Sequence, residues 1–368
     1  MKFRILFMPL LRIPSGHHHV ADSIKIQLNQ SLGEFHCEKV EIVSHCYGHV
    51  ETLISSIYLK WIHKFPGLYS QIYKNAAVKD IIGKKRFYLY EWLFLKKVQH
   101  CIEQTKPDLI ICTHALPSYI LERLKKRNLW SGPVINVYTD YFINNLWGKE
   151  GINYHFVPSP YVEKELLKRG IKPQQTFVTG IPIHPLFKPG KRPLIKKGKF
   201  TVLISGGNMG AGSIQQLLNR LNPSGSVVYK VLCGKNKTLL QSIECLNNKH
   251  IIPLPYISQK EKMNQLYDEA DAIITKPGGV TITECLRKRL PIFVYEALPG
   301  QEEINLHYLK SHALIYHLEN YESMTNIEDE IIDTLQQNLV RYNERLDAFN
   351  NSFEYNDVSM IVKKILTS

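Results

Sequence analysis

The chain has 368 residues, of which 44% are hydrophobic, and its formal net charge is +13 at pH 7. A chain of this length and apolar content can bury substantial cores, which favours two domains over one. Its seven cysteines are dispersed and form no C-x-x-C pair, so they indicate reduced, mostly buried thiols rather than a disulfide framework.

The amino terminus has a basic start and a short apolar run, as a signal peptide does. However, Arg4, Pro9 and Arg12 interrupt this run, and no small-x-small cleavage pattern follows it. The chain also has no uncharged apolar stretch of the roughly 18 residues that a membrane-spanning helix needs. We therefore expect a cytoplasmic protein.

The first predicted strand, Phe3–Leu10, leads into a Pro-Ser-Gly-His-His-His turn and then into a helix whose apolar face carries Val20, Ile24 and Leu28. His17 falls in the first turn of that helix. There its imidazole can act as a general base on an acceptor hydroxyl, although a helix N-terminus lowers its basicity. Because adjacent histidines point in different directions on a helix, we expect no metal site here.

Three further strands are predicted in the first half, at Val40–Ser44, Leu109–Thr113 and Val134–Thr139, and helical patterns alternate with them. This alternation predicts parallel α/β units. Asp140 follows the last of these strands, where it can orient His17 or take the hydroxyl proton itself. A turn or N-cap aspartate is the structural alternative. The sequence leaves open which of the two residues is the base.

The region Ile57–Lys97 holds nine lysines and arginines and two acids. Its net charge is therefore more than half of the chain's formal net charge of +13. Aromatic residues are interleaved with these cations, as suits the interface of an anionic membrane. Nucleic-acid binding and an ordinary helix with a solvated basic face are the alternatives. The residues expected to face the membrane or the acceptor are Trp61, Lys84, Lys85, Arg86 and Trp92.

The most linker-like segment is 186–199, which has six basic residues, four prolines or glycines and no acid. It separates two predicted domains. The predicted divisions are a first domain over 1–185, the linker over 186–199, a second domain over 200–345, and a last helix over 346–368 that packs back on the first domain.

The second domain opens with a predicted strand, Phe200–Ser205, and a glycine-rich turn over 206–212. Such a turn can cradle a phosphate, and Gly207 is its candidate contact. A lone glycine cluster can also serve only as a tight connection between a strand and a helix.

A second glycine turn follows the predicted strand Ala272–Thr275 and opens a helix. Gly278 and Gly279 leave no side chain over the first turn, so main-chain N–H groups and the helix dipole can face a diphosphate. Thr281 can add a hydroxyl, and Glu284 can accept both hydroxyls of a ribose. The Thr-x-x-Glu pattern is also that of a capping box, which would satisfy only the helix itself.

The next apolar run ends in a Pro-Gly turn, after which come Gln301, Glu302 and Asn305. Ligands bind outside the carboxyl ends of parallel strands, so these side chains can converge on the ligand of the preceding turn. An amide beside a carboxylate suits the hydroxyls of a sugar. The same residue types are also ordinary at a helix start.

The run from Ile274 to Asn305 resembles the donor-sugar motif of glycosyltransferase family 28. The resemblance is to its diacylglycerol branch, which contains plant monogalactosyldiacylglycerol synthase and the bacterial processive diacylglycerol glucosyltransferases. Further matching pieces, in order, are Val137–Asp140, Tyr161–Leu167, Gly180–Ile183 and Leu232–Asn236. The resemblance implies an α/β GT-B fold, with two Rossmann-like domains whose parallel sheets face a central cleft, and a reaction that requires no metal or other cofactor.

The same resemblance assigns roles to individual residues. It implies that the diphosphate is contacted by Gly279 and Thr281, the ribose by Glu284, the transferred sugar by Gln301 and Glu302, and the uracil by Tyr256 and Ile257. His17 matches the histidine of the family's Gly-x-Gly-His loop, although this chain has Pro14 where the first glycine is usual.

We therefore predict an inverting glycosyltransferase that moves a hexose from a UDP-sugar to a lipid acceptor such as diacylglycerol. It would lie peripherally at the cytoplasmic face of the cell membrane, and no nucleic-acid partner is expected. One alternative is a UDP-sugar epimerase of the same architecture, which would need no basic aromatic surface. The other is a non-catalytic UDP-sugar sensor, which would keep Glu284 without needing a base.

Overall fold

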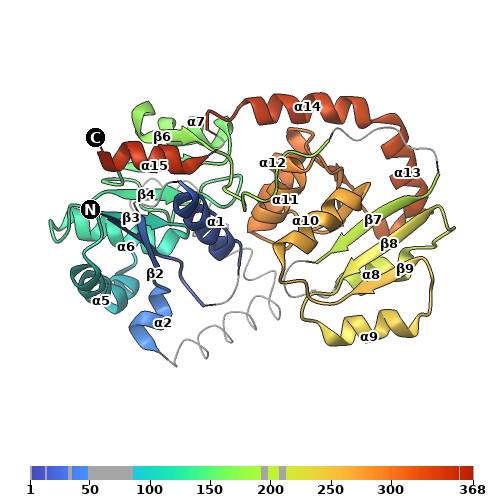
Figure 1. Ribbon diagram of the computed structural model, residues 1–368, viewed down its shortest axis with the longest axis horizontal. Helices are drawn as coiled ribbons and strands as arrows, with labels where there is room; N and C mark the ends of the chain where they lie inside the picture. Colours follow the sequence, from blue (N-terminus) through green and yellow to red (C-terminus); the bar gives the residue numbers. More distant parts are fainter. Residues whose placement is uncertain are drawn as a thin grey trace. The chain divides into compact units, whose positions relative to one another are not determined.

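The computed structural model of the protein describes residues 2–12, 15–31, 35–48, 86–191, 198–206, 213–355 and 357–367. The chain divides into two compact units (Figure 1). Unit 1 contains residues 1–185 and 352–368, and unit 2 contains residues 186–351. Each unit has a parallel sheet and a hydrophobic core of its own.

The sheet of unit 1 has six strands within the described ranges, all parallel, in the order β2-β1-β3-β4-β5-β6. They are β1 (Phe3–Phe7), β2 (Phe35–Lys39), β3 (Leu109–Cys112), β4 (Val134–Val137), β5 (Tyr154–Val157) and β6 (Thr176–Val178). The chain moves from β1 outward to β2 and then returns to β3 on the other side of β1. The strand order thus reverses between β1 and β3, and ligands of such sheets bind at the carboxyl ends there.

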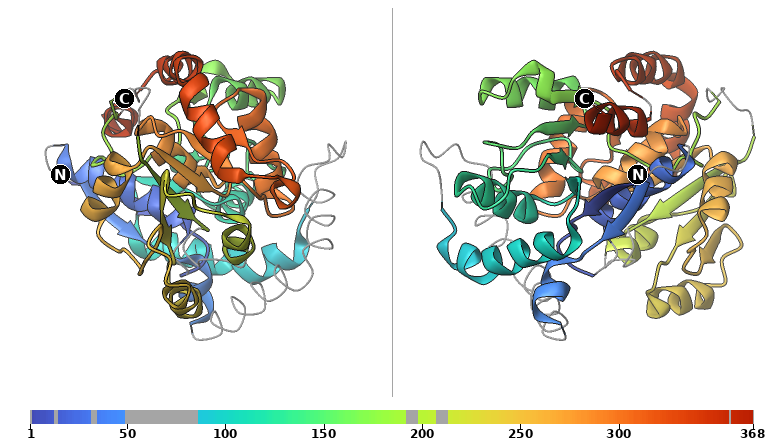
Figure 2. Two further views of the ribbon diagram at one scale, coloured as in Figure 1. Left: turned by 90° about the vertical axis from the view of Figure 1, so that its right-hand side faces the viewer. Right: turned by 60° about the vertical axis from the view of Figure 1, so that its left-hand side comes forward.

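Helices cover both faces of this sheet (Figure 2). They are α1 (Gly16–Gln30), α2 (Ile42–Tyr47), α5 (Tyr88–Thr105), α6 (Ala115–Lys126), α7 (Pro160–Lys168), the short 3-10 helix η2 (Pro173–Gln175) and α15 (Val358–Thr367). The last helix, α15, packs against α1 at the other end of the chain, and the main-chain N–H of Val358 donates to the side-chain oxygen of Gln27 at 3.2 Å. Within the described ranges, every helix is too short or too polar to cross a membrane.

The alternation of side chains along the strands explains how the core of unit 1 forms. Leu6, Met8, Ile110 and Cys112 occupy alternate positions of β1 and β3, with Met8 just past the end of β1, and they share one cluster with apolar residues of α2, α5 and α6. Successive side chains of a strand point to opposite faces, so the intervening residues of β1 and β3 lie on the opposite face of the sheet. Because both faces are covered, β3 is apolar throughout, and β1 is apolar apart from the exposed Arg4 near its start.

The prediction of a strand at Val40–Ser44 is wrong. The strand lies earlier, at Phe35–Lys39, and the apolar run continues into helix α2, whose first residues Ile42 and Val43 are buried. A short apolar run fits a buried strand and a buried helical turn equally well, and pairing with β1 decided between them. The other strands predicted in this unit are present, although each is shorter than its apolar run.

Unit 2 has a second parallel sheet, in the order β12-β11-β10-β7-β8-β9. Its strands are β7 (Phe200–Ser205), β8 (Val227–Leu232), β9 (Ile251–Leu254), β10 (Ala272–Thr275), β11 (Ile292–Val294) and β12 (Tyr316–His317). Its helices are α8 (Ser213–Arg220), α9 (Lys237–Cys245), α10 (Lys260–Glu269), α11 (Gly279–Arg287), α12 (Gln301–Ser311), η3 (Tyr321–Ser323), α13 (Ile327–Gln337) and α14 (Leu339–Asn351). Here the strand order reverses between β7 and β10, where Ser205 pairs with Thr275 at the carboxyl ends.

Candidate functional site

In unit 1, three neighbouring strands meet at His17. This residue lies in the first turn of α1, the helix that follows β1 in the chain. Its Nδ1 atom is 2.7 Å from the main-chain oxygen of Thr113, which follows β3, and 3.1 Å from Oγ1 of Thr139, which follows β4. Because β1, β3 and β4 are adjacent, their carboxyl-end loops bring these residues together.

The hydrogen bond to Thr113 determines which nitrogen of His17 carries the proton. A carbonyl oxygen can only accept a hydrogen bond, so Nδ1 of His17 is the donor. In the neutral imidazole the lone pair is then on Nε2. A ring held at Nδ1 with its lone pair on Nε2 has the form that a general base requires.

The surroundings of His17 also favour its neutral form. Burial lowers the pKa of His17 below its ordinary value, while the nearby carboxylate of Asp140 and the hydrogen bond to Thr113 act in the opposite direction. Asp140 directly follows Thr139 and is half-buried. Its negative charge therefore favours proton uptake by the imidazole without reversing the effect of burial.

His114, which was not predicted, belongs to the same group of side chains. Its ring contacts that of His17 edge to face, with 4.6 Å between the centroids. It is the N-cap of α6, and its Nδ1 accepts from the main-chain N–H of Leu116 at 3.1 Å. Burial lowers the pKa of His114 well below its ordinary value. One signal in the sequence was available, because Thr113 and His114 follow a buried strand as Asp140 does.

In unit 2, the glycine turn opens α11 without a side-chain cap. The N-cap is Gly278, so Thr281 lies within the first turn, and the capping-box alternative is wrong. The φ angle of Gly278 is −80°, and a Cβ atom built there would meet nothing within 4 Å. Neither the backbone nor the packing thus requires glycine at this position. The close approach of a ligand to the uncapped first-turn N–H groups would require it.

Glu284 is buried one turn further along α11, at 6% exposure. The hydroxyl of Tyr267 donates to its Oε2 at 3.0 Å, and Nζ of Lys260 lies 3.5 Å from its Oε1. Burial raises the pKa of Glu284, while Lys260 and Tyr267 lower it. Each carboxylate oxygen has two lone pairs, so hydroxyl groups of a ligand can still bind. Neither partner was predicted, because both come from α10, where no pattern marks them.

The polar residues that open α12 hold the turns around this site. Asn305 is 1% exposed, and its side-chain NH₂ donates to the main-chain oxygen of Pro277 at 3.1 Å, which ties α12 to the glycine turn. Glu302 accepts from the main-chain N–H of Leu298 at 2.7 Å. Gln301 is the first residue of α12 and is half-buried. Asn305 is therefore placed to fix the shape of the glycine turn.

The remaining predicted donor residues lie near β9 or outside the described residues. Tyr256 follows β9 and is 46% exposed, and Nζ of Lys235 lies 5.3 Å from the centroid of its ring. Ile257, next to it, is half-buried. Gly207 lies outside the described residues, as do Trp61, Lys84 and Lys85 of the predicted membrane region. Across the described ranges, the acids, histidines and cysteines form no group of three or more arranged to hold a metal ion.

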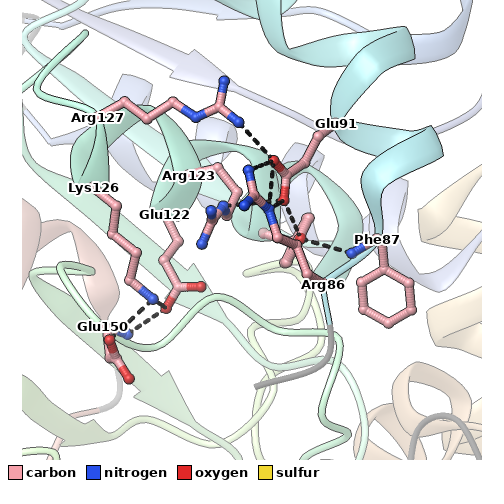
Figure 3. A network of polar contacts seen from close by, with 9 residues as sticks. Arg86, Phe87, Glu91, Glu122, Arg123, Lys126, Arg127 and Glu150 are labelled. Atoms are coloured by element: carbon pink, nitrogen blue, oxygen red, sulfur yellow. Dashed lines mark hydrogen bonds and ion pairs between the residues drawn. The ribbon is translucent and has the colours of Figure 1, made fainter. Parts of the chain in front are cut away.

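Two of the predicted membrane residues are described, and they differ in their surroundings. Trp92 is 78% exposed on α5. Arg86 is paired with Glu91, a carboxylate that is 4% exposed and also contacts Arg123 and Arg127 (Figure 3). Three guanidinium groups around one carboxylate leave a net positive charge beside the start of α5. The ion pairs also tie α5 to α6.

Comparison with known proteins covers both units. Residues 17–183 match the family model for monogalactosyldiacylglycerol (MGDG) synthase, and residues 201–358 match the glycosyltransferase family 28 C-terminal domain. The chain is 42% identical over 368 residues to the uncharacterized glycosyltransferase YkoN of Bacillus subtilis (strain 168). The aligned region covers 98% of this chain and 97% of that protein. It is 30% identical over 343 residues to the processive diacylglycerol beta-glucosyltransferase of Bacillus pumilus (strain SAFR-032), and the aligned region covers 88% of this chain and 87% of that protein.

Among solved structures, the crystal structure of Acinetobacter baumannii MurG superposes with a TM-score of 0.59 at 17% identity, covering 99% of this chain and 100% of that chain. The two parallel six-stranded sheets within the described ranges and this likeness establish the GT-B fold. The resemblance seen in the donor motif is thus confirmed along nearly the whole chain. The chain belongs to glycosyltransferase family 28, in the branch of the diacylglycerol glucosyltransferases and monogalactosyldiacylglycerol synthase.

Proposed function

We propose that this glycosyltransferase transfers a hexose from a UDP-sugar to the hydroxyl group of a diacylglycerol, with inversion at the anomeric carbon. The observation that carries the proposal is the state of His17, whose Nδ1–H is bonded to Thr113 so that Nε2 can accept a proton. The lipid acceptor is supported by the relatives that are named diacylglycerol beta-glucosyltransferases and by the match to the MGDG synthase model.

In the proposed reaction, the acceptor hydroxyl gives its proton to Nε2 of His17 while its oxygen attacks the anomeric carbon. The bond between that carbon and the diphosphate breaks, and UDP leaves with the electron pair. Attack from the side opposite the leaving group inverts the configuration. Asp140 stabilises the resulting imidazolium ion. The first-turn N–H groups of α11 stabilise the charge that develops on the diphosphate, and Glu284 accepts the ribose hydroxyls.

A release assay tests this function directly. Purified protein is incubated with a panel of UDP-sugars and with vesicles that contain or lack diacylglycerol, and free UDP and glycolipid are measured. We expect glycolipid only when diacylglycerol and one UDP-hexose are both present. Conversion of the UDP-sugar into an epimer without lipid would support the epimerase instead. Binding of UDP-sugar without any turnover would support the sensor.

Replacing Gly278 with alanine should weaken UDP binding without destabilising the fold. The structure accommodates a Cβ atom at this position, so the thermal midpoint should stay close to that of the parent. The added methyl group would occupy the space above the uncapped helix start, and we expect the UDP affinity, measured by calorimetry, to fall about tenfold or more. Unchanged affinity would mean that the diphosphate does not approach Gly278.

We further propose that the protein binds peripherally to anionic membrane at the inner face of the cell, through the start of α5. Tyr88, Leu89 and Trp92 are 67%, 70% and 78% exposed there. Arg86 lies beside them, with its guanidinium group 4.6 Å from the centroid of the Tyr88 ring. Exposed aromatic and aliphatic groups beside excess positive charge suit the headgroup region of an anionic bilayer.

Membrane association should therefore rise with anionic lipid and fall with added salt, which shortens the Debye length from about 10 Å at 0.1 M. Replacing Trp92 with alanine should weaken vesicle sedimentation about tenfold, because it removes one large apolar group from the interface. Tyr161→Ala, which removes a half-exposed ring from α7, serves as the matched control and should sediment as the parent does. Equal sedimentation with neutral and anionic vesicles would contradict the proposed surface.

A further inference from the structure

The rings of His17 and His114 present opposite hydrogen-bonding groups side by side. Nδ1 of His17 donates to the Thr113 carbonyl, which leaves a lone pair on Nε2. Nδ1 of His114 instead accepts from the main-chain N–H of Leu116, so the proton of its neutral ring is on Nε2. One ring is thus a hydrogen-bond acceptor at Nε2, and the other is a donor.

His114 cannot itself serve as the base. Its Nδ1 lone pair is already occupied by a main-chain N–H, and its Nε2 already carries a proton. Burial lowers the pKa of His114 well below its ordinary value, so the ring stays neutral near pH 7. It therefore offers a fixed, uncharged N–H group beside His17.

The spacing of the rings suits one small polar molecule. The centroids are 4.6 Å apart, and each ring atom lies little more than a bond length from its centroid. The two Nε2 atoms are therefore at most about 7 Å apart, and two oxygens on neighbouring carbons can bridge such a distance when each makes a hydrogen bond of about 3 Å to one ring. A molecule that directs one hydroxyl at His17 can therefore place its adjoining oxygen within reach of His114.

We propose that His114 is a positioning residue for the acceptor, whose Nε2–H donates to the oxygen next to the attacking hydroxyl while that hydroxyl donates to Nε2 of His17. This inference rests on the proposed function and narrows the acceptor to molecules with oxygens on adjacent carbons. The glycerol unit of a diacylglycerol is such a molecule, because an ester oxygen adjoins its hydroxyl.

Substitution can separate this role from the cap of α6. Capping uses only Nδ1, and the side-chain oxygen of asparagine can replace it at an N-cap. His114→Asn therefore keeps the cap and removes the Nε2–H group. His114→Gln carries an NH₂ group to about the reach of the original donor. His36→Asn, on the exposed side of strand β2, is the matched control for the substitution itself.

The experiment uses the full chain, 1,2-dioctanoylglycerol as a short-chain acceptor, and the UDP-sugar that the parent turns over. For His114→Asn we expect kcat/KM toward dioctanoylglycerol to fall about tenfold or more, which corresponds to the loss of one well-formed hydrogen bond. UDP affinity and the thermal midpoint should stay as in the parent. His114→Gln should recover part of the loss, and His36→Asn should behave as the parent.

The possible outcomes separate the two proposals. If the parent transfers sugar and His114→Asn transfers it equally well, His114 is only a cap, and the inference is overturned while the function stands. The inference would also be overturned if UDP affinity fell by the same factor as kcat/KM, or if the thermal midpoint fell clearly below that of the parent. A structural defect would then explain the loss. A parent that binds UDP-sugar but transfers nothing to dioctanoylglycerol contradicts the proposed function, and the inference falls with it.

Discussion

Replacing His17 with alanine should lower kcat by about 10²–10⁴ while leaving UDP affinity largely intact, because the variant loses proton transfer in unit 1 and keeps the donor residues of unit 2. The side chain that is lost contacts Thr113 and Thr139, which both belong to unit 1. Turnover is measured by UDP release with diacylglycerol vesicles, and affinity by calorimetry. Circular dichroism checks that the variant folds.

The pH dependence distinguishes His17 from Asp140 as the base. A base must be unprotonated, and burial lowers the pKa of His17 below 6.5. We therefore expect kcat/KM to stay constant from neutral pH to a pH below 6.5, and to decline only as the pH falls through the lowered pKa of His17. Asp140 raises the pKa of His17, so Asp140→Asn should move that decline to still lower pH and keep part of the activity. If Asp140→Asn abolishes turnover while His17→Ala retains it, Asp140 is the base.

Replacing Glu284 with alanine should lower UDP affinity about 100-fold, because a carboxylate that accepts two ribose hydroxyls makes two charge-assisted hydrogen bonds. The variant should also be less stable. The hydroxyl of Tyr267 and the ammonium group of Lys260 lose their partner, and a buried unpaired polar group costs about 1–3 kcal/mol. Calorimetry with UDP and the thermal midpoint measure the two effects separately.

Tyr267→Phe is the matched control for Glu284→Ala. It removes the same 3.0 Å hydrogen bond but keeps the carboxylate. We expect it to lower stability by a comparable amount and UDP affinity by much less than the glutamate variant. If both variants lose UDP affinity to the same extent, Glu284 acts through the packing of α10 on α11, and the ribose assignment is wrong.

Several features of this protein were readable from local patterns. The apolar strands that end at Ser205 and Thr275 and the glycine turn before α11 follow from run lengths and turn residues. The ordered motifs identify the family by themselves, and the two family models match the stretches that contain them. In contrast, the strand placed at Val40–Ser44 was wrong, because a short apolar run does not determine whether it pairs with a neighbour.

The sequence by itself determined the alternation of strands and helices, the glycine turn and the presence of His17, Asp140 and Glu284, since each depends on residues close together in the chain. Only the tertiary structure showed that His17 donates to Thr113 and contacts His114, and that Glu284 is held by Tyr267 and Lys260. His17 and Thr113 are 96 residues apart. These two residues meet because β1 and β3, which are distant in sequence, are neighbours in the sheet. Local sequence patterns do not determine which strands become adjacent.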